Sequence, residues 1–284
     1  MIGKPVIGST MSSIQRSCRK PVEKHLRKQG GAQSVRRTIK ILRYVAMYNE
    51  RGVRLSKVAV GTELHVTTAS RILSVLVEEG FVTHDSHTKL YNLGFEFHSL
   101  AKSTEFSLIL NTYRTTLENI AQETNNTTYL IVRSGYDTLC IDRVEGAYSI
   151  RIHFDIGRRL PIGVGASGVA LLAFRPDSEV GTILSNNELR YARYNMTIEI
   201  IGHLVGLARE LGYARSEGHF LKGVTAVAAP IFNAKNECVA SITVASTSER
   251  MSHRRCDEIG QLLKSEIKLI PPLIRRPQLN EKSL

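Results

Sequence analysis

The chain lacks the long apolar segments that a membrane protein needs. No apolar run in its 284 residues approaches the ~18 residues that a membrane-spanning helix requires. The N-terminus also lacks a continuous apolar core followed by a small-residue cleavage site, which a secretory signal peptide would show. Hydrophobic residues make up 42% and charged residues 23% of the chain, an ordinary balance for a globular protein. We therefore expect a cytoplasmic protein without a membrane partner.

Motifs for metal binding, disulfides and catalysis are also missing. The four cysteines form no CxxC pair, and the nine histidines form no HExxH. This argues against a disulfide framework and a zinc site. There is no G-x-S-x-G and no phosphate-binding G-x-x-x-x-G-K, and no general base can be assigned to the serine of GASG, Ser167. We expect no cofactor and no enzymatic activity.

Positive charge is abundant, and it is unevenly distributed. Residues 1–102 contain 17 lysines and arginines against 7 aspartates and glutamates, whereas residues 103–284 contain 21 against 19. A basic module suits a polyanionic partner, because each neutralised phosphate releases counterions. Charge alone leaves a merely solvated basic surface equally open. Single-stranded RNA is disfavoured, because the basic region lacks aromatic residues on which bases would stack.

The first hundred residues have the element order of a winged helix. Residues 1–33 are basic and poor in apolar residues, which predicts a disordered arm that either contacts phosphates or has little role. Residues 34–93 then show three helical segments followed by a strand–turn–strand pattern. The third helix is expected to start at Thr67 as its N-cap and to stop at Gly80.

The third helix is the candidate recognition helix, which would contact the bases of DNA. The N-terminal turn of a recognition helix enters the major groove, where hydroxyls and the helix dipole suit phosphates and arginine suits guanine. Arg71 has an alternative role in pairing with Glu78 or Glu79. The expected DNA-binding residues lie on the first helix, on the third helix and at the wing tip: Arg36, Thr67, Thr68, Ser70, Arg71, Ser74, His87 and Lys89.

The remaining chain predicts an α+β architecture. Residues 94–104 read as a linker helix, 105–276 as a second domain and 277–284 as a tail. Strands are expected at 127–133, 137–143, 147–152, 212–216, 224–232 and 238–246. Helices are expected at 166–174, 177–185, 197–211 and 252–270, and 94–124 should hold two. Hairpin-type spacing favours an antiparallel sheet with flanking helices.

Several motifs, in order, resemble the IclR-type transcription regulators. They are TTASRIL, EEGFV, GRRLPIGVGASGVALLA, ELGYARSEGHFLKGVTAVAAPIFNAKNECVASITVAS and the closing ERM, spread over residues 34–276. The chain departs from the family at Glu63, where a glycine is usual before the turn residue Leu64, and at Val169, where a lysine is common. The resemblance implies a winged helix-turn-helix, a helical linker and a GAF-like domain that binds a small organic acid.

The resemblance also places an effector site. Its residues would be Ala166, Ser167, Ser216, Glu217, Ala226, Thr243 and Ala245, with Ser216 and Glu217 as alternatives for one polar position. The glycine-rich stretch 163–168 enters a helix, and free amides at a helix start favour a carboxylate. Alanines replace hydroxyls or thiols found in several family members, which predicts an apolar, aromatic or branched acid rather than a very small keto acid.

Two functions therefore remain in view. The first is a DNA-binding regulator that works as a homodimer or homotetramer on a partly palindromic operator, with the acid shifting the arrangement of the linker helices. The second is a DNA-binding regulator whose C-terminal domain only oligomerises and binds no ligand.

Overall fold

The structure is a computed structural model that describes residues 32–102, 106–148, 154–218 and 220–270. The chain divides into two compact units between Ser107 and Leu108, and each is described by itself. The sequence placed this boundary between residues 104 and 105. The expected arm lies outside the described residues except for 32–33, and the expected tail lies entirely outside them. None of the described helices has the length and apolar character needed to cross a bilayer.

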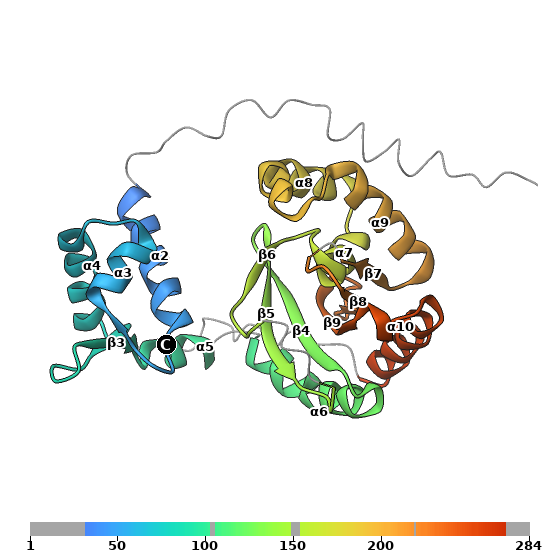
Figure 1. The fold of residues 1–284 in the computed structure, drawn as a ribbon, viewed down its shortest axis with the longest axis horizontal. Coiled ribbons are helices and arrows are strands. Elements are labelled where there is room, and N and C mark those ends of the chain that lie inside the picture. The colour runs from blue at the N-terminus through green and yellow to red at the C-terminus, as the bar shows by residue number, and fades with distance from the viewer. Residues whose placement is uncertain (1–31, 103–105, 149–153, 219, 271–284) are drawn as a thin grey trace, which may run out of the picture. The chain divides into compact units, whose positions relative to one another are not determined.

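The smaller unit is a winged helix (Figure 1). Its elements are α2 (Gln33–Met47), β1 (Val53–Arg54), α3 (Leu55–Thr62), α4 (Val66–Glu78), β2 (Val82–His84), β3 (Leu90–Leu93) and α5 (Glu96–Lys102). The three strands pair antiparallel in the order β1-β3-β2. The short strand β1 was not expected, because two residues are too few to show an alternating pattern.

The core of this unit explains why the helices form where they do. The apolar positions of α2, α3 and α4 converge on a cluster that includes Ile41, Val45, Val58 and Leu73, each completely buried. The linker helix α5 belongs to the same unit, because the ring of Phe97 packs edge-on against Phe81 on the wing side at 5.4 Å. Burial of these apolar side chains is the main stabilising term for so small a domain.

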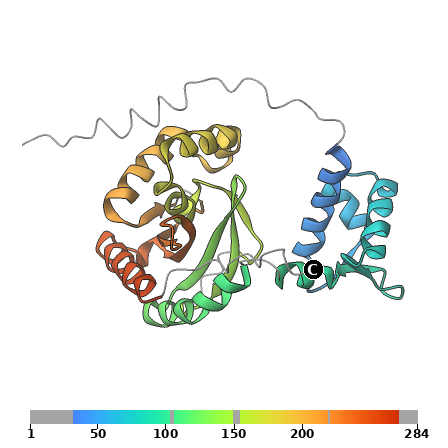
Figure 2. The same cartoon turned by 180° about the vertical axis from the view of Figure 1, so that it is seen from behind.

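The larger unit is built on one antiparallel sheet (Figures 1 and 2). Its strands are β4 (Thr127–Ser134), β5 (Asp137–Val144), β6 (Arg159–Pro161), β7 (Ala214–Glu217), β8 (Val224–Phe232) and β9 (Cys238–Thr247), in the order β6-β5-β4-β9-β8-β7. Its helices are α6 (Phe106–Thr124), α7 (Gly165–Ala173), α8 (Asp177–Tyr191), α9 (Ile198–Leu211) and α10 (His253–Lys268), with short 3-10 turns η2 (Ala192–Tyr194) and η3 (Ser248–Arg250). These elements confirm the expected α+β class.

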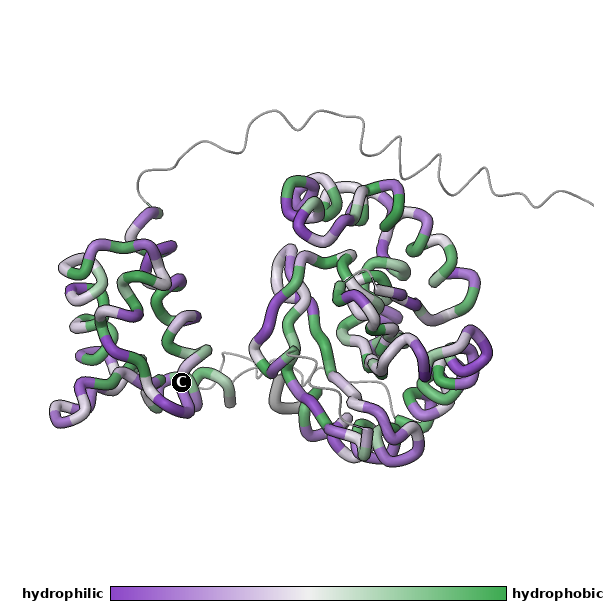
Figure 3. Tube along the Cα trace, viewed as in Figure 1, coloured by the Kyte–Doolittle hydropathy of each residue, from purple (hydrophilic) through white to green (hydrophobic). Residues whose placement is uncertain are grey.

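Helices cover both faces of this sheet. Helix α7 lies between one face and α9, so it is apolar all round and almost completely buried. Hydrophobic colour accordingly runs through α7, whereas α8, α9 and α10 alternate (Figure 3). On the other face, Arg114 of α6 pairs with Asp142 of β5 at 2.8 Å, and Tyr213 beside β7 donates a hydrogen bond to Asp257 of α10 at 2.5 Å.

One expected strand is wrong at its start. Residues 147–148 of the expected strand 147–152 form a turn, and 149–153 lie outside the described residues. The amide of Tyr148 donates to the carbonyl of Asn125 at 2.9 Å, so this segment folds back on the end of α6. Gly146 permits the approach, because a Cβ there would lie 2.4 Å from the backbone of Asn125. The edge strand β6, at 159–161, was not expected.

Candidate functional site

Helix α4, the candidate recognition helix, presents one exposed polar stripe. Thr67, Arg71 and Ser74 are exposed at positions i, i+4 and i+7, whereas Thr68 and Ser70 are half-buried. Within the described residues, Arg71 has no carboxylate within ion-pair distance, so the alternative pairing with Glu78 or Glu79 is not formed. A free guanidinium on the exposed face is therefore able to meet a base edge or a phosphate.

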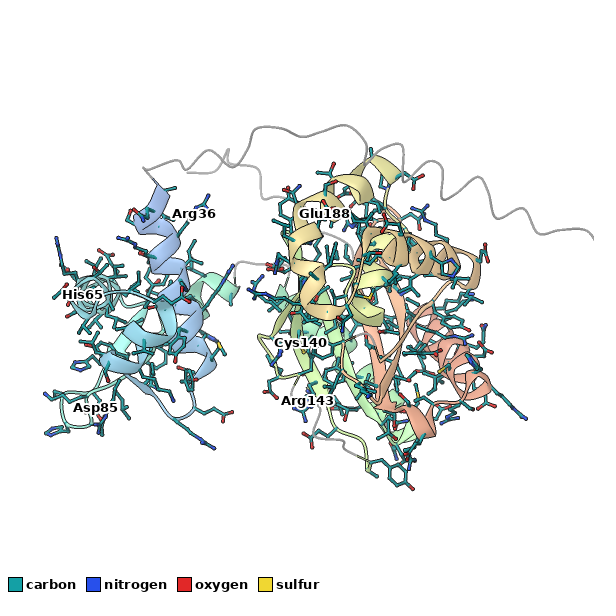
Figure 4. The ribbon with its side chains drawn as sticks, turned by 45° about the horizontal axis from the view of Figure 1, so that its top comes forward. Arg36, His65, Asp85, Cys140, Arg143 and Glu188 are labelled. Atoms are coloured by element: carbon teal, nitrogen blue, oxygen red, sulfur yellow. The ribbon has the colours of Figure 1, made fainter. Side chains whose placement is uncertain are left out.

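The cap of α4 differs from the expected one. Helix α4 starts at Val66, and His65 rather than Thr67 occupies the N-cap (Figure 4). The His65 Nδ1 lies 2.8 Å from the Thr67 Oγ1 and accepts a hydrogen bond from the Thr67 amide at 3.4 Å. An imidazole nitrogen thus takes the place of the usual hydroxyl or carboxylate cap. Histidine is not among the residues preferred at helix starts, so the sequence did not indicate this cap.

The wing tip is organised by Asp85 (Figure 4). Its carboxylate accepts hydrogen bonds from the amide of His87 at 2.8 Å and from the hydroxyl of Thr88 at 2.8 Å. These bonds lower the pKa of the Asp85 carboxyl, with the Thr88 hydroxyl as the largest cause. His87 and Lys89 are exposed at this tip, and Lys89 adopts a left-handed conformation with a φ of +59°.

The first helix adds positive charge to the same unit. Arg36, Lys40 and Arg43 line a groove on α2 together with Ile39. Lys40 is paired with Glu63, which follows α3. The smaller unit therefore carries cationic side chains on α2, on α4 and at the wing tip.

The larger unit contains a cavity between the sheet and the start of α7. It encloses about 510 Å³ of empty space, counting the part that is open to solvent. Its lining comes from β4, β6, β7, β8 and β9, from the first turn of α7 and from the loops beside them. The lining residues are Tyr129, Ile131, Phe154, Leu160, Gly165, Ala166, Ser167, Ser216, Phe220, Leu221, Val224, Ala226, Thr243 and Ala245.

The strand register explains the cavity floor. Ser216, Ala226 and Ala245 lie opposite one another on β7, β8 and β9, which places their side chains in one row on the same face. The next row contains Ala228 and Thr243. These small side chains leave space beneath α7, while bulky side chains close the sides. The rings of Tyr129, Phe154 and Phe220 pack edge-on in a chain, with centroids 5.7 Å and 5.6 Å apart.

Glycines shape the loop that leads into α7. Gly163 and Gly165 have φ values of +105° and +73°, a region that side chains with a Cβ rarely adopt. At Gly168 a Cβ would lie 2.6 Å from the Gly163 amide nitrogen, so only glycine permits the close packing of loop and helix. The buried Tyr191 hydroxyl fixes the loop by donating to the Ile162 carbonyl at 2.7 Å.

The polar groups of the cavity are uncharged donors. No side chain among the described residues caps the start of α7, so the backbone N–H groups of its first turn lack partners within the helix. No lysine or arginine occurs among the described residues that line the cavity. The phenol of Tyr129 and the hydroxyl of Thr243 are buried and, in the part of the chain that the structure describes, have no hydrogen-bond partner. Burial also raises the pKa of Tyr129 to about 12, which keeps its hydroxyl protonated.

The structure brings together six of the seven residues that the resemblance suggested for an effector. Only Glu217 is not among the lining residues. Because side chains alternate along β7, Glu217 lies on the opposite face from Ser216, with its carboxylate 3.9 Å from His253. The sequence reasoning missed the aromatic residues, chiefly Tyr129, Phe154 and Phe220. The sequence of β4 gives no signal for Tyr129, because the strand is buried on both faces and its apolar residues are continuous rather than alternating.

Other chemistry finds little support within the described ranges. No three histidine, cysteine, aspartate or glutamate side chains gather there as a metal site would require. The described cysteines are buried, and burial raises the pKa of Cys140 and of Cys238 to about 12. Their thiols therefore stay protonated at neutral pH and are poor nucleophiles.

The chain thus combines a basic winged helix with a separate α+β domain that contains a partly open cavity. Such a chain is a DNA-binding regulator with a second domain suited to a small ligand. Two family models match it: the IclR helix-turn-helix domain over residues 34–86, and the bacterial transcriptional regulator IclR C-terminal domain over residues 102–269. The chain belongs to the IclR family of DNA-binding transcription regulators.

Characterised relatives and solved structures agree with this assignment. The transcriptional repressor IclR of Escherichia coli is 26% identical over 251 residues, which cover 86% of this chain and 91% of the relative. The transcriptional regulator KipR of Bacillus subtilis is 27% identical over 214 residues, covering 74% and 85%. The crystal structure of an IclR regulator from Alicyclobacillus acidocaldarius has a TM-score of 0.68 at 24% identity, covering 82% of this chain and 95% of that chain, and shows that the fold is shared.

Proposed function

We propose that this regulator reads an operator with α4 and the wing and that a small organic acid in the cavity controls it. The main observation in support of ligand control is the cavity at the start of α7, where backbone amides without a partner in the helix lie near the hydroxyls of Ser167 and Ser216. A carboxylate accepts hydrogen bonds from such donors and is further stabilised by the positive end of the helix dipole.

The body of the proposed acid is largely apolar. The alanine floor and the rings of Tyr129, Phe154 and Phe220 favour a flat or branched hydrocarbon body over a very small keto acid. An IclR homologue from Microbacterium hydrocarbonoxydans was crystallised with 4-hydroxybenzoate, and its chain superimposes with a TM-score of 0.68 at 19% identity, over 83% of this chain and 96% of that chain. 4-Hydroxybenzoate is the ligand of that homologue, and it supplies a chemical starting point for a ligand screen with this chain.

The proposed DNA contacts are Arg36 on α2, the α4 residues Thr67, Thr68, Ser70, Arg71 and Ser74, and His87 and Lys89 at the wing tip. Among these, Thr68 and Ser70 are only half-exposed, so Thr67, Arg71 and Ser74 are the residues best able to reach the groove. We place this activity in the cytoplasm.

We further propose a homodimer or homotetramer. Phe95, directly before α5, is an apolar side chain that is 88% exposed. A second copy of the chain covering it would also pair two recognition helices for a two-fold operator. Sedimentation equilibrium of the full chain tests this point, and a monomer at micromolar concentration would contradict it.

The test of ligand control is operator binding measured with and without acid. Fluorescence anisotropy of an operator fragment from the chain's own promoter region should show a change of several-fold in affinity when 4-hydroxybenzoate, phenylacetate or a branched-chain keto acid is added. Calorimetry on the same samples should show saturable binding. If no acid binds while the operator still does, the second domain serves only for oligomerisation.

A further inference from the structure

The cavity floor continues beyond the cavity lining to a partly buried arginine. In the strand register Arg143 of β5 lies opposite Tyr129 of β4, and Tyr129 lies opposite Thr243 of β9. Residues that lie directly opposite in an antiparallel pair project from the same face of the sheet. Arg143, Tyr129 and Thr243 therefore form one row on the face that carries the cavity.

All three residues of this row keep buried polar atoms without a partner. Within the described ranges, the hydroxyls of Tyr129 and Thr243 and the Nε of Arg143 have no hydrogen-bond partner. Buried polar groups are normally hydrogen-bonded, and each unpaired one is destabilising. Tyr129 and Thr243 also line the cavity, so a ligand in it would be able to supply partners for their hydroxyls.

The row lies away from the proposed carboxylate position. Ser216 lies on β7, at one side of the cavity, whereas Tyr129 lies on β4, three strands further along the sheet. Neighbouring strands are about 4.8 Å apart, so the backbones of β7 and β4 are separated by about 14 Å. A ligand that is anchored at α7 thus has an opposite end, and that end points toward the unpaired row.

The charge around Arg143 indicates which chemical group the far end of the ligand should carry. Its Nη1 lies 3.0 Å from the Asp155 carboxylate, and its Nη2 pairs with Glu145 (Arg143 is labelled in Figure 4). These two carboxylates already neutralise the guanidinium, and no lysine or arginine occurs among the described residues that line the cavity. A second carboxylate on the ligand would be repelled, whereas an uncharged oxygen would accept hydrogen bonds without that penalty.

We propose that Tyr129 and Thr243 bind an uncharged oxygen at the far end of the effector, which makes the effector a monocarboxylic acid with a distal hydroxyl or keto group. This inference rests on the proposed function, because it presumes that an acid occupies the cavity. Tyr129 and Thr243 are the specificity-determining residues, and Arg143, which is not among the lining residues, lies beside Tyr129 in the same row.

The test compares acids that differ in a single hydroxyl. Isothermal titration of the full chain with benzoate and 4-hydroxybenzoate, and with phenylacetate and 4-hydroxyphenylacetate, should show that the hydroxylated acid of at least one pair binds roughly 3- to 10-fold more tightly, the effect of one or two neutral hydrogen bonds. Terephthalate, which carries a second carboxylate in place of the hydroxyl, should bind more weakly than 4-hydroxybenzoate.

Two variants assign that preference to the row. Tyr129→Phe, and separately Thr243→Val, should bring the affinity ratio of the favoured pair toward 1 while the affinity for the plain acid stays within about 2-fold, the scatter of non-additive effects. Tyr136→Phe removes a hydroxyl from a 44% exposed tyrosine outside the cavity lining and should keep the ratio of the unaltered chain. Thermal unfolding without ligand checks that each variant folds.

The outcomes separate the two proposals. Acids that bind with no hydroxyl preference, tighter binding of terephthalate, or a ratio unchanged in both row variants would overturn the inference about the far end and leave ligand control intact. If none of the five acids binds, the proposed control by acids of this size fails and the inference fails with it.

Discussion

The carboxylate of Glu63 lies 3.1 Å from the ammonium group of Lys40, which ties the turn after α3 to the first helix. Glu63 occupies the C-cap of α3 in a left-handed conformation, with a φ of +55° and a ψ of +37°. Its side chain is 86% exposed, and exposed ion pairs of this kind contribute only ~0.2–1 kcal/mol. The left-handed backbone itself costs a residue with a Cβ roughly 1–2 kcal/mol. Backbone conformation therefore outweighs the ion pair at this turn.

Substitutions at position 63 that disturb the backbone conformation should therefore be more destabilising than those that remove only the ion pair. Glu63→Gln removes the charge but keeps the shape, and it should change the free energy of unfolding by less than about 0.5 kcal/mol. Glu63→Val should lower it by about 1–2 kcal/mol, because a β-branched residue tolerates positive φ worst. Urea unfolding of the full chain measures both. A loss for Glu63→Gln as large as that for Glu63→Val would show that the ion pair dominates.

The helices of this chain were predictable because their patterns are local. Helix α9 has Thr197 as its N-cap, whose Oγ1 accepts a hydrogen bond from the Ile200 amide, and Gly212 as its C-cap, so residue types alone mark both ends. Strands β1 and β6 are too short to show a period. The expected strand at 147–152 failed at its start because the bond from Tyr148 to Asn125 depends on residues far back in the chain.

The residues of the candidate cavity were likewise predictable only in part. Its floor residues, such as Ser216 and Ala226, were found through family motifs, and the register of β7 and β8 then brings them side by side. Its walls were not found, because Tyr129, Phe154 and Phe220 are distant in the sequence and meet only when the sheet closes. The turn at Glu63 shows the reverse case, in which a departure from the family motif leaves the backbone turn in place.

Two glycines in helices of the larger unit should respond oppositely to alanine. Gly168→Ala places a Cβ 2.6 Å from the backbone of Gly163, so it should lower the free energy of unfolding by roughly 1–3 kcal/mol. Gly202→Ala in α9 meets no described atom within 4 Å and should raise it by up to about 1 kcal/mol, because alanine favours the helix. Thermal unfolding followed by circular dichroism compares the pair. Equal effects of the two variants would contradict the close approach at Gly168.

Filling the cavity should remove ligand binding and spare DNA binding. Ala226→Leu introduces a bulky side chain into the floor, between Ser216 and Ala245. We expect the stabilisation of the chain by phenylacetate or 4-hydroxybenzoate in a thermal shift assay to disappear, while the operator affinity without ligand stays the same. The matched control is Ala192→Leu, at an exposed position in η2, which should keep the ligand response. Retained binding by Ala226→Leu would place the acid elsewhere.

The wing should lose order in acid through one carboxylate. Asp85 has a lowered pKa in the folded state because it accepts hydrogen bonds from the Thr88 hydroxyl and from the amides of His87 and Thr88. Its contribution is therefore present above the unfolded pKa of about 3.9 and is lost as the pH falls through the lower folded value. A carboxyl-carbon NMR titration should give a midpoint for Asp85 below 3.9, with the His87 amide shifting in parallel. A midpoint at or above the ordinary value would mean that the turn is open in solution.

Arg71 should carry sequence discrimination in DNA binding. Its guanidinium is exposed on α4 and has no carboxylate partner among the described residues, so Arg71→Ala removes a donor that is free to fork onto a guanine. We expect the operator affinity to fall by roughly 10- to 100-fold, equivalent to about 1–3 kcal/mol, with a smaller loss on unrelated duplexes and no change in acid binding. Arg254→Ala removes an equal charge from a 90% exposed site on α10 and should leave operator affinity intact. If Arg71→Ala lowers the affinity for operator and unrelated DNA equally, Arg71 contacts only phosphates. If it lowers neither affinity, Arg71 does not contact DNA.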